Sequence, residues 1–270
     1  MVKEVIDAFV EVGLEVSAAK CHWSSYPPSP GTELAIAGGQ LAWESQIKFV
    51  GTVLNLGGND GAALEDRLAQ ADKLFHRWKP YLQCKQVSVT QRIKLLCSTV
   101  FSSVLWLAET WVLTKQQREH LDSWGARAAS RAGMVQRRLH EDMGQYWRRM
   151  HRAGHKWLRR AGGSLDRRRA TRLHSFAGHV ARTANDLLQT VLHTRCLAWW
   201  RFRQARYQSK HDGLHPKRFK VWRWESQLTS FYGEQESEQA SDNVGWMLQA
   251  QCRDTWKDSL DKYLIDVVGS

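Results

Sequence analysis

The apolar positions near the start of the chain change from helical spacing to the spacing of strands. Residues 3–14 carry apolar side chains three or four positions apart, which predicts a helix. The three prolines within residues 24–31 predict a loop, because proline cannot continue a helix. Residues 33–43 predict two short strands joined at Gly38-Gly39, since glycine accepts the positive φ of a tight turn. The β-branched and aromatic run 47–54 predicts a third strand.

Helical patterns follow from residue 60 onward. Asp60 can cap a helix whose apolar face reaches Trp78, with Pro80 near its end. The segment 88–91 (SVTQ) has the form of a capping box and predicts a nearly all-apolar, buried helix that continues to Leu105.

Beyond residue 115 the helical pattern becomes rich in arginine, and its apolar stripes become weaker. Gly162-Gly163 predicts a short break, after which Ser164 can cap the next helix. Residues 208–217 predict a loop, and the polar, acidic stretch 230–243 predicts a linker. Residues 245–268 predict one amphipathic helix. The whole pattern predicts a mainly α-helical fold with a small β part near the N-terminus.

Positive charge is concentrated in one part of the chain. The formal net charge is +12, but residues 115–223 hold 26 Lys or Arg against 7 Asp or Glu, a net charge of +19. A segment of this kind predicts a polyanionic partner, because cations near phosphates release condensed counterions. Most of these residues are arginine, whose planar fork suits phosphate. The alternative is a solvated basic surface without a ligand.

Arginine runs in this segment alternate with aromatic residues, and each run is a candidate nucleic-acid contact. The runs are Arg148-Arg149, Arg159-Arg160 and Arg167-Arg168-Arg169. The interleaved aromatics are Tyr146, Trp147, Trp157, Trp199 and Trp200. This combination is typical of phosphate contact together with stacking on unpaired bases. RNA or DNA is therefore the predicted partner, although most of the 14 tryptophans are expected in the core.

Metal binding, disulfides and a membrane span are not predicted. His151 and His155 can share one helix face, but no cysteine or carboxylate stands at regular ligand spacing beside them. The 5 cysteines are scattered, which favours a reducing intracellular compartment, and the basic runs are compatible with nuclear import. No apolar run is long enough for a membrane span, and the sequence after Met1 lacks the features of a secretory signal.

Six short motifs stand in an order that is found in one family. They are residues 13–20 (GLEVSAAK), 49–51 (FVG), 67–71 (RLAQA), Lys94 with 105–111 (LWLAETW), 177–182 (AGHVAR) and 251–256 (QCRDTW). In this order the chain resembles the C-terminal part of LINE-type (non-LTR) retroelement reverse transcriptases. Two positions depart from the family pattern: Ser17 stands where asparagine is commoner, and Leu107 stands where glycine is usual.

The resemblance implies a division of the chain into five parts. They are a truncated palm remnant with one helix, short antiparallel strands and a primer-grip-like hairpin (1–58), a thumb helical bundle (59–125), an Arg/Trp-rich basic helical tail (126–228), a polar linker (229–244) and a C-terminal amphipathic helix (245–270). A palm remnant without its partner strands would expose sheet edges and an apolar helix face, which favours association.

The resemblance also adds candidate contacts to nucleic acid. These are Lys20, Phe49, Gly51, Arg67, Arg92, Lys94, His179 and Arg182. By analogy with the family, Lys20 would lie near the incoming triphosphate, and Phe49 with Gly51 would turn a hairpin against the primer terminus. The basic residues of the thumb would follow the phosphates of a primer–template duplex without reading sequence. The alternative for each is an ordinary surface or core position.

The paired catalytic aspartates of the family would precede the segment that opens this chain. No Asp-Asp pair occurs in the 270 residues, and scattered aspartates cannot be assumed to hold the two metal ions of polymerisation. No catalytic residue and no resident cofactor are therefore predicted, although a full-length relative would use Mg²⁺. The chain is expected to bind RNA or DNA, and to have the missing upstream polymerase region as a further candidate partner. A stand-alone nucleic-acid-binding protein and a decayed element remnant without selected function stay open as alternatives.

Overall fold

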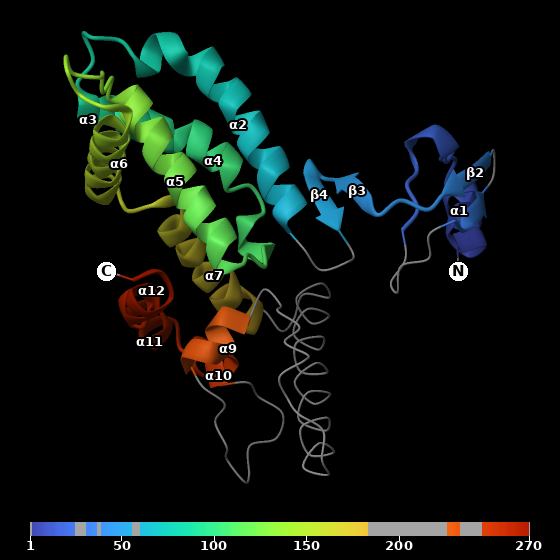
Figure 1. Ribbon diagram of the computed structural model, residues 1–270. Coiled ribbons are helices and arrows are strands. Elements are labelled where there is room, and N and C mark those ends of the chain that lie inside the picture. The colour runs from blue at the N-terminus through green and yellow to red at the C-terminus, as the bar shows by residue number, and fades with distance from the viewer. Residues whose placement is uncertain are drawn as a thin grey trace, which may run out of the picture. The chain divides into compact units, whose positions relative to one another are not determined.

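The computed structural model describes residues 2–24, 31–36, 39–55, 60–182, 226–232 and 245–269. Within these ranges the chain is mainly helical and has two small antiparallel sheets, which confirms the predicted fold class (Figure 1). Packing divides it into an N-terminal unit, Met1–Gln70, and a C-terminal unit, Ala71–Ser270. The functional division at residues 58, 125, 228 and 244 stays a prediction.

The N-terminal unit contains helix α1 (Val2–Glu11), the short 3₁₀ helix η1 (Ala18–Lys20) and two separate hairpins. Strands β1 (Glu33–Ile36) and β2 (Gly39–Ala42) pair antiparallel, as the sequence predicted. Strands β3 (Gln46–Phe49) and β4 (Thr52–Asn55) form the second hairpin. The prediction of a single strand over residues 47–54 is therefore wrong.

The chain reverses between β3 and β4 at Val50 and Gly51, which have φ values of 46° and 77°. Positive φ at both central residues is typical of the two-residue turns whose twist matches paired strands. A β-branched residue rarely adopts this conformation, so Val50 concealed the turn in the sequence pattern. The Gly51 carbonyl accepts a hydrogen bond of 2.5 Å from Arg67 Nη2, which ties the hairpin to helix α2 (Gly61–Leu82).

Several apolar side chains of the N-terminal unit remain exposed. Phe9 and Val10 on α1 are 43% and 62% exposed, and Phe49 and Val50 at the tip of the hairpin are exposed to a similar extent. Each of the two described sheets has only two strands. The apolar surface expected on the N-terminal helix is therefore present, and it is a surface that could be covered by association.

Local capping signals define the helices of the C-terminal unit. Ser88 and Gln91 form the predicted capping box at the start of α3 (Val89–Ser98), which α4 (Val100–Val104) and the 3₁₀ turn η2 (Ala108–Thr110) follow. Thr114 and Gln117 form a second capping box at α5 (Lys115–Ala132), and Asp142 caps α6 (Met143–Arg160). The Ser164 hydroxyl accepts a hydrogen bond from the Arg167 backbone at the start of α7 (Leu165–Arg182), as predicted.

Small residues allow α5 and α6 to pack very closely. A Cβ atom at Gly154 of α6 would lie 2.1 Å from the Ala126 carbonyl oxygen of α5, and one at Gly133 would overlap the Trp157 ring. The Ser130 hydroxyl donates a hydrogen bond of 2.5 Å to the Met150 carbonyl across the same interface. These contacts determine which face of α6 is buried.

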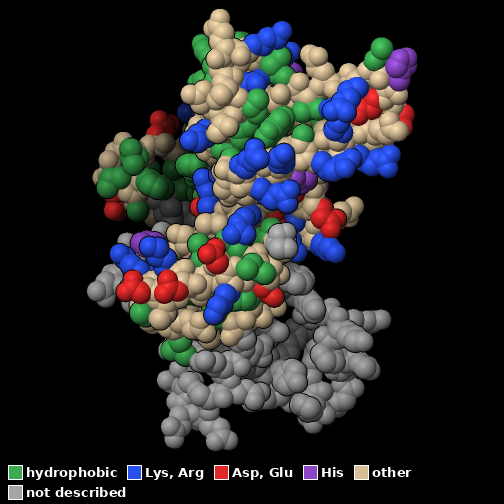
Figure 2. All heavy atoms as spheres, turned by 90° about the vertical axis from the view of Figure 1, so that its left-hand side faces the viewer, with side chains coloured by type: hydrophobic (Ala, Val, Ile, Leu, Met, Phe, Trp, Pro, Cys, Tyr) green, Lys and Arg blue, Asp and Glu red, His purple; other side chains and the backbone are tan. Residues whose placement is uncertain are grey.

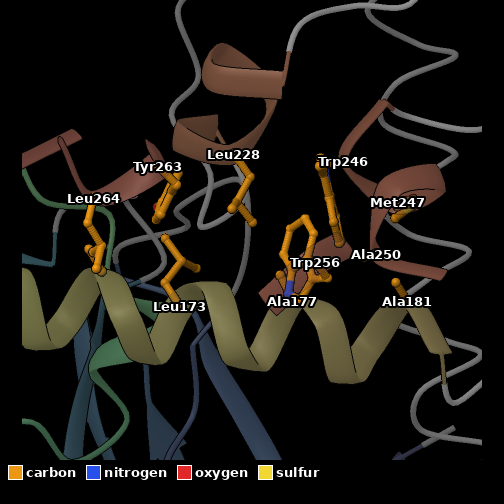
Figure 3. Close-up of a cluster of buried hydrophobic side chains, with 11 residues drawn as sticks. Leu173, Ala177, Ala181, Leu228, Trp246, Met247, Ala250, Trp256, Tyr263 and Leu264 are labelled. Carbon is orange, nitrogen blue, oxygen red and sulfur yellow. The ribbon is translucent and has the colours of Figure 1, made fainter. Parts of the chain in front are cut away.

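A second core joins α7 to four short helices near the C-terminus. They are α9 (Ser226–Tyr232), α10 (Gly245–Gln251), α11 (Arg253–Asp258) and α12 (Leu260–Val268). Trp246, Trp256 and Tyr263 all point toward α7 (Figure 3). The prediction of one helix over residues 245–268 is therefore wrong. The chain is extended at Cys252, and this break lets successive short helices turn their aromatic side chains to the same partner.

His174 lies at the centre of this second core and is 2% exposed. Its ring stacks on Trp256 with centroids 3.9 Å apart and planes 13° apart. Its Nε2 lies 2.8 Å from the Tyr232 hydroxyl and 3.3 Å from the Ser259 hydroxyl. The imidazole therefore links α7 to α9 and to the residue that precedes α12.

Some predicted features lie outside the described residues. These are the loop at 208–217, the residues Trp199 and Trp200, and the linker beyond residue 232. Residues 230–232 belong to α9. None of the described helices is long and apolar enough to cross a membrane.

The α5–α6 interface should not tolerate a side chain at Gly154. We expect Gly154→Ala to lower the free energy of unfolding by about 3 kcal/mol, because the added methyl group must displace backbone atoms. Urea unfolding followed by circular dichroism measures the change. Gly144→Ala in the same helix is the control, because its Cβ would meet only the exposed Asp142 carboxylate at 3.2 Å. Equal losses in the two variants would contradict the packing argument.

The free energy of unfolding should decrease as the pH is lowered, because His174 is buried in its neutral form. Burial first, and then the positive charge of Arg182, lower the pKa of His174 from 6.5 to about 4. Unfolding therefore takes up a proton between these values, so this contribution is complete above about pH 6.5 and is lost toward pH 4. We expect a loss on the order of 3 kcal/mol over this range in the wild type. The variant His174→Gln should lack this pH-dependent loss. Urea unfolding at pH 7 and pH 4.5 measures the loss in both proteins. An identical pH dependence in both proteins would exclude His174 as the cause.

Candidate nucleic-acid interface

Several arginines donate hydrogen bonds to carbonyl groups at the C-terminal ends of helices. Such carbonyls have no partner within their own helix, and a cation there also complements the helix dipole. Five arginines of the C-terminal unit are used in this way: Arg92, Arg118, Arg168, Arg172 and Arg182. Three of them, Arg92, Arg168 and Arg182, are among the candidate nucleic-acid contacts.

The individual contacts connect helices that are distant in sequence. Arg92 of α3 donates to the Ala132 carbonyl at the end of α5 over 2.7 Å. Arg182 of α7 donates to the Ala250 carbonyl in the last turn of α10 over 2.8 Å. Arg168 donates to the carbonyl of Ala161, which follows α6. These guanidinium groups hold the fold together.

Burial removes three candidates from the surface. Arg169 is 1% exposed, and its Nε donates to the Asp166 carboxylate over 2.7 Å. Arg92 and Arg67 are each 6% exposed and donate to backbone carbonyls. A buried guanidinium cannot reach a phosphate unless the structure opens. Contact of Arg67, Arg92 and Arg169 with nucleic acid stays a prediction, and in this structure their side chains donate to partners inside the chain.

Arg149 of α6 also has partners inside the chain, in the segment between α5 and α6. It donates two hydrogen bonds, of 2.8 and 2.7 Å, to the Glu141 carboxylate and a third to the Gln136 carbonyl. The Arg149 hydrogen bond is the main reason, followed by the Arg138 backbone N–H, that the pKa of Glu141 falls to about 2. This ion pair holds the segment between α5 and α6 in place.

The α6 basic face consists of Arg148, Arg152, Lys156, Arg159 and Arg160. Four of these residues follow one another at intervals of four, and all five are exposed. Over the 18 residues of α6 there is no Asp or Glu. Since an α-helix rises about 1.5 Å per residue, the face extends about 18 Å from Arg148 to Arg160.

Packing explains why these cations gather on one side. Met150, Gly154 and Leu158 are buried at intervals of four, and α5 is the principal partner of α6. The remaining side of the helix must therefore face solvent. Figure 2 shows the side on which α6 lies in Figure 1, with Lys and Arg side chains gathered across the middle of that surface.

The side chains of the α6 basic face have few competing partners. The Nε atoms of Arg148 and Arg152 lie 3.3 and 3.4 Å from carbonyls one turn earlier in the helix. Among the described residues, Lys156, Arg159 and Arg160 make no hydrogen bond or ion pair. Trp147, which is 45% exposed, lies on the same helix. Its position in the helix is on the side of the buried Gly154 and Leu158, so the face itself offers cations to phosphates.

The other candidate contacts belong to other elements of the chain. Lys20, Phe49 and Gly51 belong to the N-terminal unit, Lys94 is exposed on α3, and His179 is exposed on α7. Arg167 lies 3.6 Å from the Asp261 carboxylate.

The sequence interpretation did not single out Arg152 and Lys156. Their spacing of four from Arg148 and from Arg160 was the signal that could have identified them. The structure brings them together with Arg148, Arg159 and Arg160 on one face of one helix.

Metal ligands do not gather in the described part of the chain: it contains no group of three or more His, Cys, Asp or Glu side chains placed to hold an ion. Comparison with known protein families, with curated proteins and with solved structures finds no match to this chain. The functional conclusion therefore depends on the chemistry of the α6 basic face.

Arg92 and Lys94 lie two residues apart on α3, and their environments predict different effects of substitution. Arg92→Met should lower the free energy of unfolding by about 2 kcal/mol, because it removes a charged donor from the Ala132 carbonyl. Lys94→Met, at an exposed position, should change it by less than about 0.5 kcal/mol. Chemical denaturation of the two variants tests this difference. Similar effects would mean that the Arg92 contact does not stabilise the fold.

Proposed function

We propose that this chain binds RNA or DNA through the α6 basic face, and that it is a C-terminal fragment related to LINE-type reverse transcriptases. The observation that carries the binding proposal is the set of five exposed cations on one side of α6, without an acidic residue in that helix. The chain alone is not expected to polymerise nucleotides, because it has no Asp-Asp pair.

Phosphates are the chemical group that the α6 basic face suits best. Each cation that neutralises a phosphate releases counterions, so affinity should fall steeply with salt. Because the side chains are long and exposed, they can follow a phosphate backbone without reading base edges. Binding should therefore depend little on the sequence of the nucleic acid.

Two features of the backbone support the proposed relationship to reverse transcriptases. The FVG motif, residues 49–51, lies at a tight hairpin turn, which suits the primer-grip element that it resembles. Leu107 has a φ of 58°, a left-handed conformation that glycine adopts most readily. The family pattern has glycine at this position, so the backbone is compatible with the motif despite the substitution.

The α6 basic face can be tested with four substitutions to glutamine, which keeps the helix propensity nearly unchanged. We expect Arg148→Gln, Arg152→Gln, Lys156→Gln and Arg160→Gln together to weaken binding of a labelled oligonucleotide about 100-fold. The slope of log affinity against log salt should fall by about 3 to 4. Fluorescence anisotropy between 50 and 300 mM salt measures the loss of affinity, which is about 100-fold in order of magnitude, and the change in slope.

A matched control removes the same charge from another surface of the C-terminal unit. Lys73, Arg77, Lys79 and Lys85 are exposed on or just after α2, and their replacement by glutamine lowers the net charge equally. Equal losses in the two fourfold variants would mean that total charge, and not the α6 basic face, attracts the nucleic acid. Tighter binding of a primer–template junction than of plain single strands would favour descent from a reverse transcriptase. No such preference would favour a stand-alone binding protein.

A further inference from the structure

Two histidines lie together at the edge of the α6 basic face. His151 and His155 are one helical turn apart, and their ring centroids are separated by 6.2 Å. Both are partly buried, unlike the exposed cations beside them. The phosphate-binding role proposed for the face does not require these imidazoles, and among the described residues no third metal ligand accompanies them.

The charged surroundings of this pair come from two helices. Arg127 of α5 acts on His151, and Asp122 of α5 lies near enough to interact with His155. From α6 itself, Arg148, Arg152 and Arg159 stand within one turn of the pair. Helix α3 also packs against α6, but its Arg92 is directed to the Ala132 carbonyl and its Lys94 is exposed.

This environment makes a second positive charge unfavourable in the absence of an anion. Partial burial, then His155, then Arg127 lower the pKa of His151 below 6.5. The partly buried Asp122 does not supply a full compensating charge at low pH, because burial raises its pKa. It is also occupied by a hydrogen bond of 2.7 Å from the Asp166 backbone N–H. A bound anion would reverse the balance, since it would attract the same charges that repel one another.

We propose that His151 and His155, together with Arg127, form a phosphate subsite at the edge of the α6 basic face, where binding of a phosphodiester is coupled to proton uptake. The inference deepens the proposed function, and its role in nucleic-acid binding depends on that function. The ligand class is an oxyanion with the charge and size of a backbone phosphate. Nucleic acid should consequently be held more tightly in mildly acidic than in mildly alkaline solution.

The direction of the pH effect follows from linkage. An anion at the subsite raises the pKa of His151 from its lowered value in the free protein. The added affinity is therefore fully present below the pKa of the free protein, which lies under 6.5, and is lost as the pH rises through the higher pKa of the complex. Each unit of pKa increase corresponds to roughly a tenfold gain in affinity.

The subsite can be tested without nucleic acid by a nuclear magnetic resonance titration of the full chain. Sulfate is the probe, because it keeps two negative charges between pH 5 and pH 8, and chloride at the same ionic strength is the reference. We expect sulfate to raise the pKa of the His151 ring by about half a unit or more relative to chloride, and to shift the His155 ring resonances. The exposed His76 ring on α2 should respond equally to both salts. No selective response of His151 and His155 would overturn the subsite.

The coupling is then measured with an oligonucleotide at constant ionic strength. Between pH 8 and pH 5.5 the wild type should gain roughly tenfold in affinity, and the variant His151→Gln with His155→Gln should lose most of this gain. His76→Gln is the matched control and should keep it. A double variant with the full wild-type gain would contradict the proposal. Failure to bind the oligonucleotide at any pH would refute the proposed function, whereas the sulfate titration would still decide the subsite.

Discussion

The donation of hydrogen bonds by arginine to the ends of helices is the interaction on which the C-terminal unit depends. A fold of many short helices creates many terminal carbonyls, and each one that is removed from water needs a donor. Arg92, Arg172 and Arg182 supply such donors to helices far away in sequence. The same contacts place positive charge where the helix dipole is negative. The long guanidinium side chain therefore links helix positions that apolar packing alone would leave unsatisfied.

Because many arginines have structural roles, a high arginine content does not by itself identify the nucleic-acid interface. The basic segment suggested nucleic-acid binding as a whole, but several of its cations are committed to carbonyls and carboxylates inside the chain. Arg169, enclosed with Asp166, and Arg149, paired with Glu141, are examples. On α6 the situation differs, because close packing through Gly154 and Ser130 leaves the opposite side of the helix open to solvent. The cations with functional potential are the exposed ones of the α6 basic face, which form no ion pair with another described residue.

Features determined by a few neighbouring residues could be predicted from the sequence. The Ser88–Gln91 capping box and the antiparallel pairing of β1 with β2 depend on local backbone preferences, and both were predicted correctly. The second hairpin was missed because Val50 occupies a turn position that β-branched residues seldom adopt. The C-terminal segment was taken for one helix because its amphipathic pattern continues through Cys252, where the chain is extended. In that case packing against α7 overrides local propensity.

The sequence alone determined the mainly helical class, the concentration of positive charge and the order of motifs, since these follow from residue identities and short-range periodicity. Only the tertiary structure decided which arginines are buried and which form the α6 basic face. It also decided that His151 and His155 lie beside Arg127 and Asp122 of another helix. The physical reason is that exposure and electrostatic environment depend on neighbours distant in sequence. The chemistry that a side chain can perform follows from its residue type, and the packing around it determines whether a ligand can reach it.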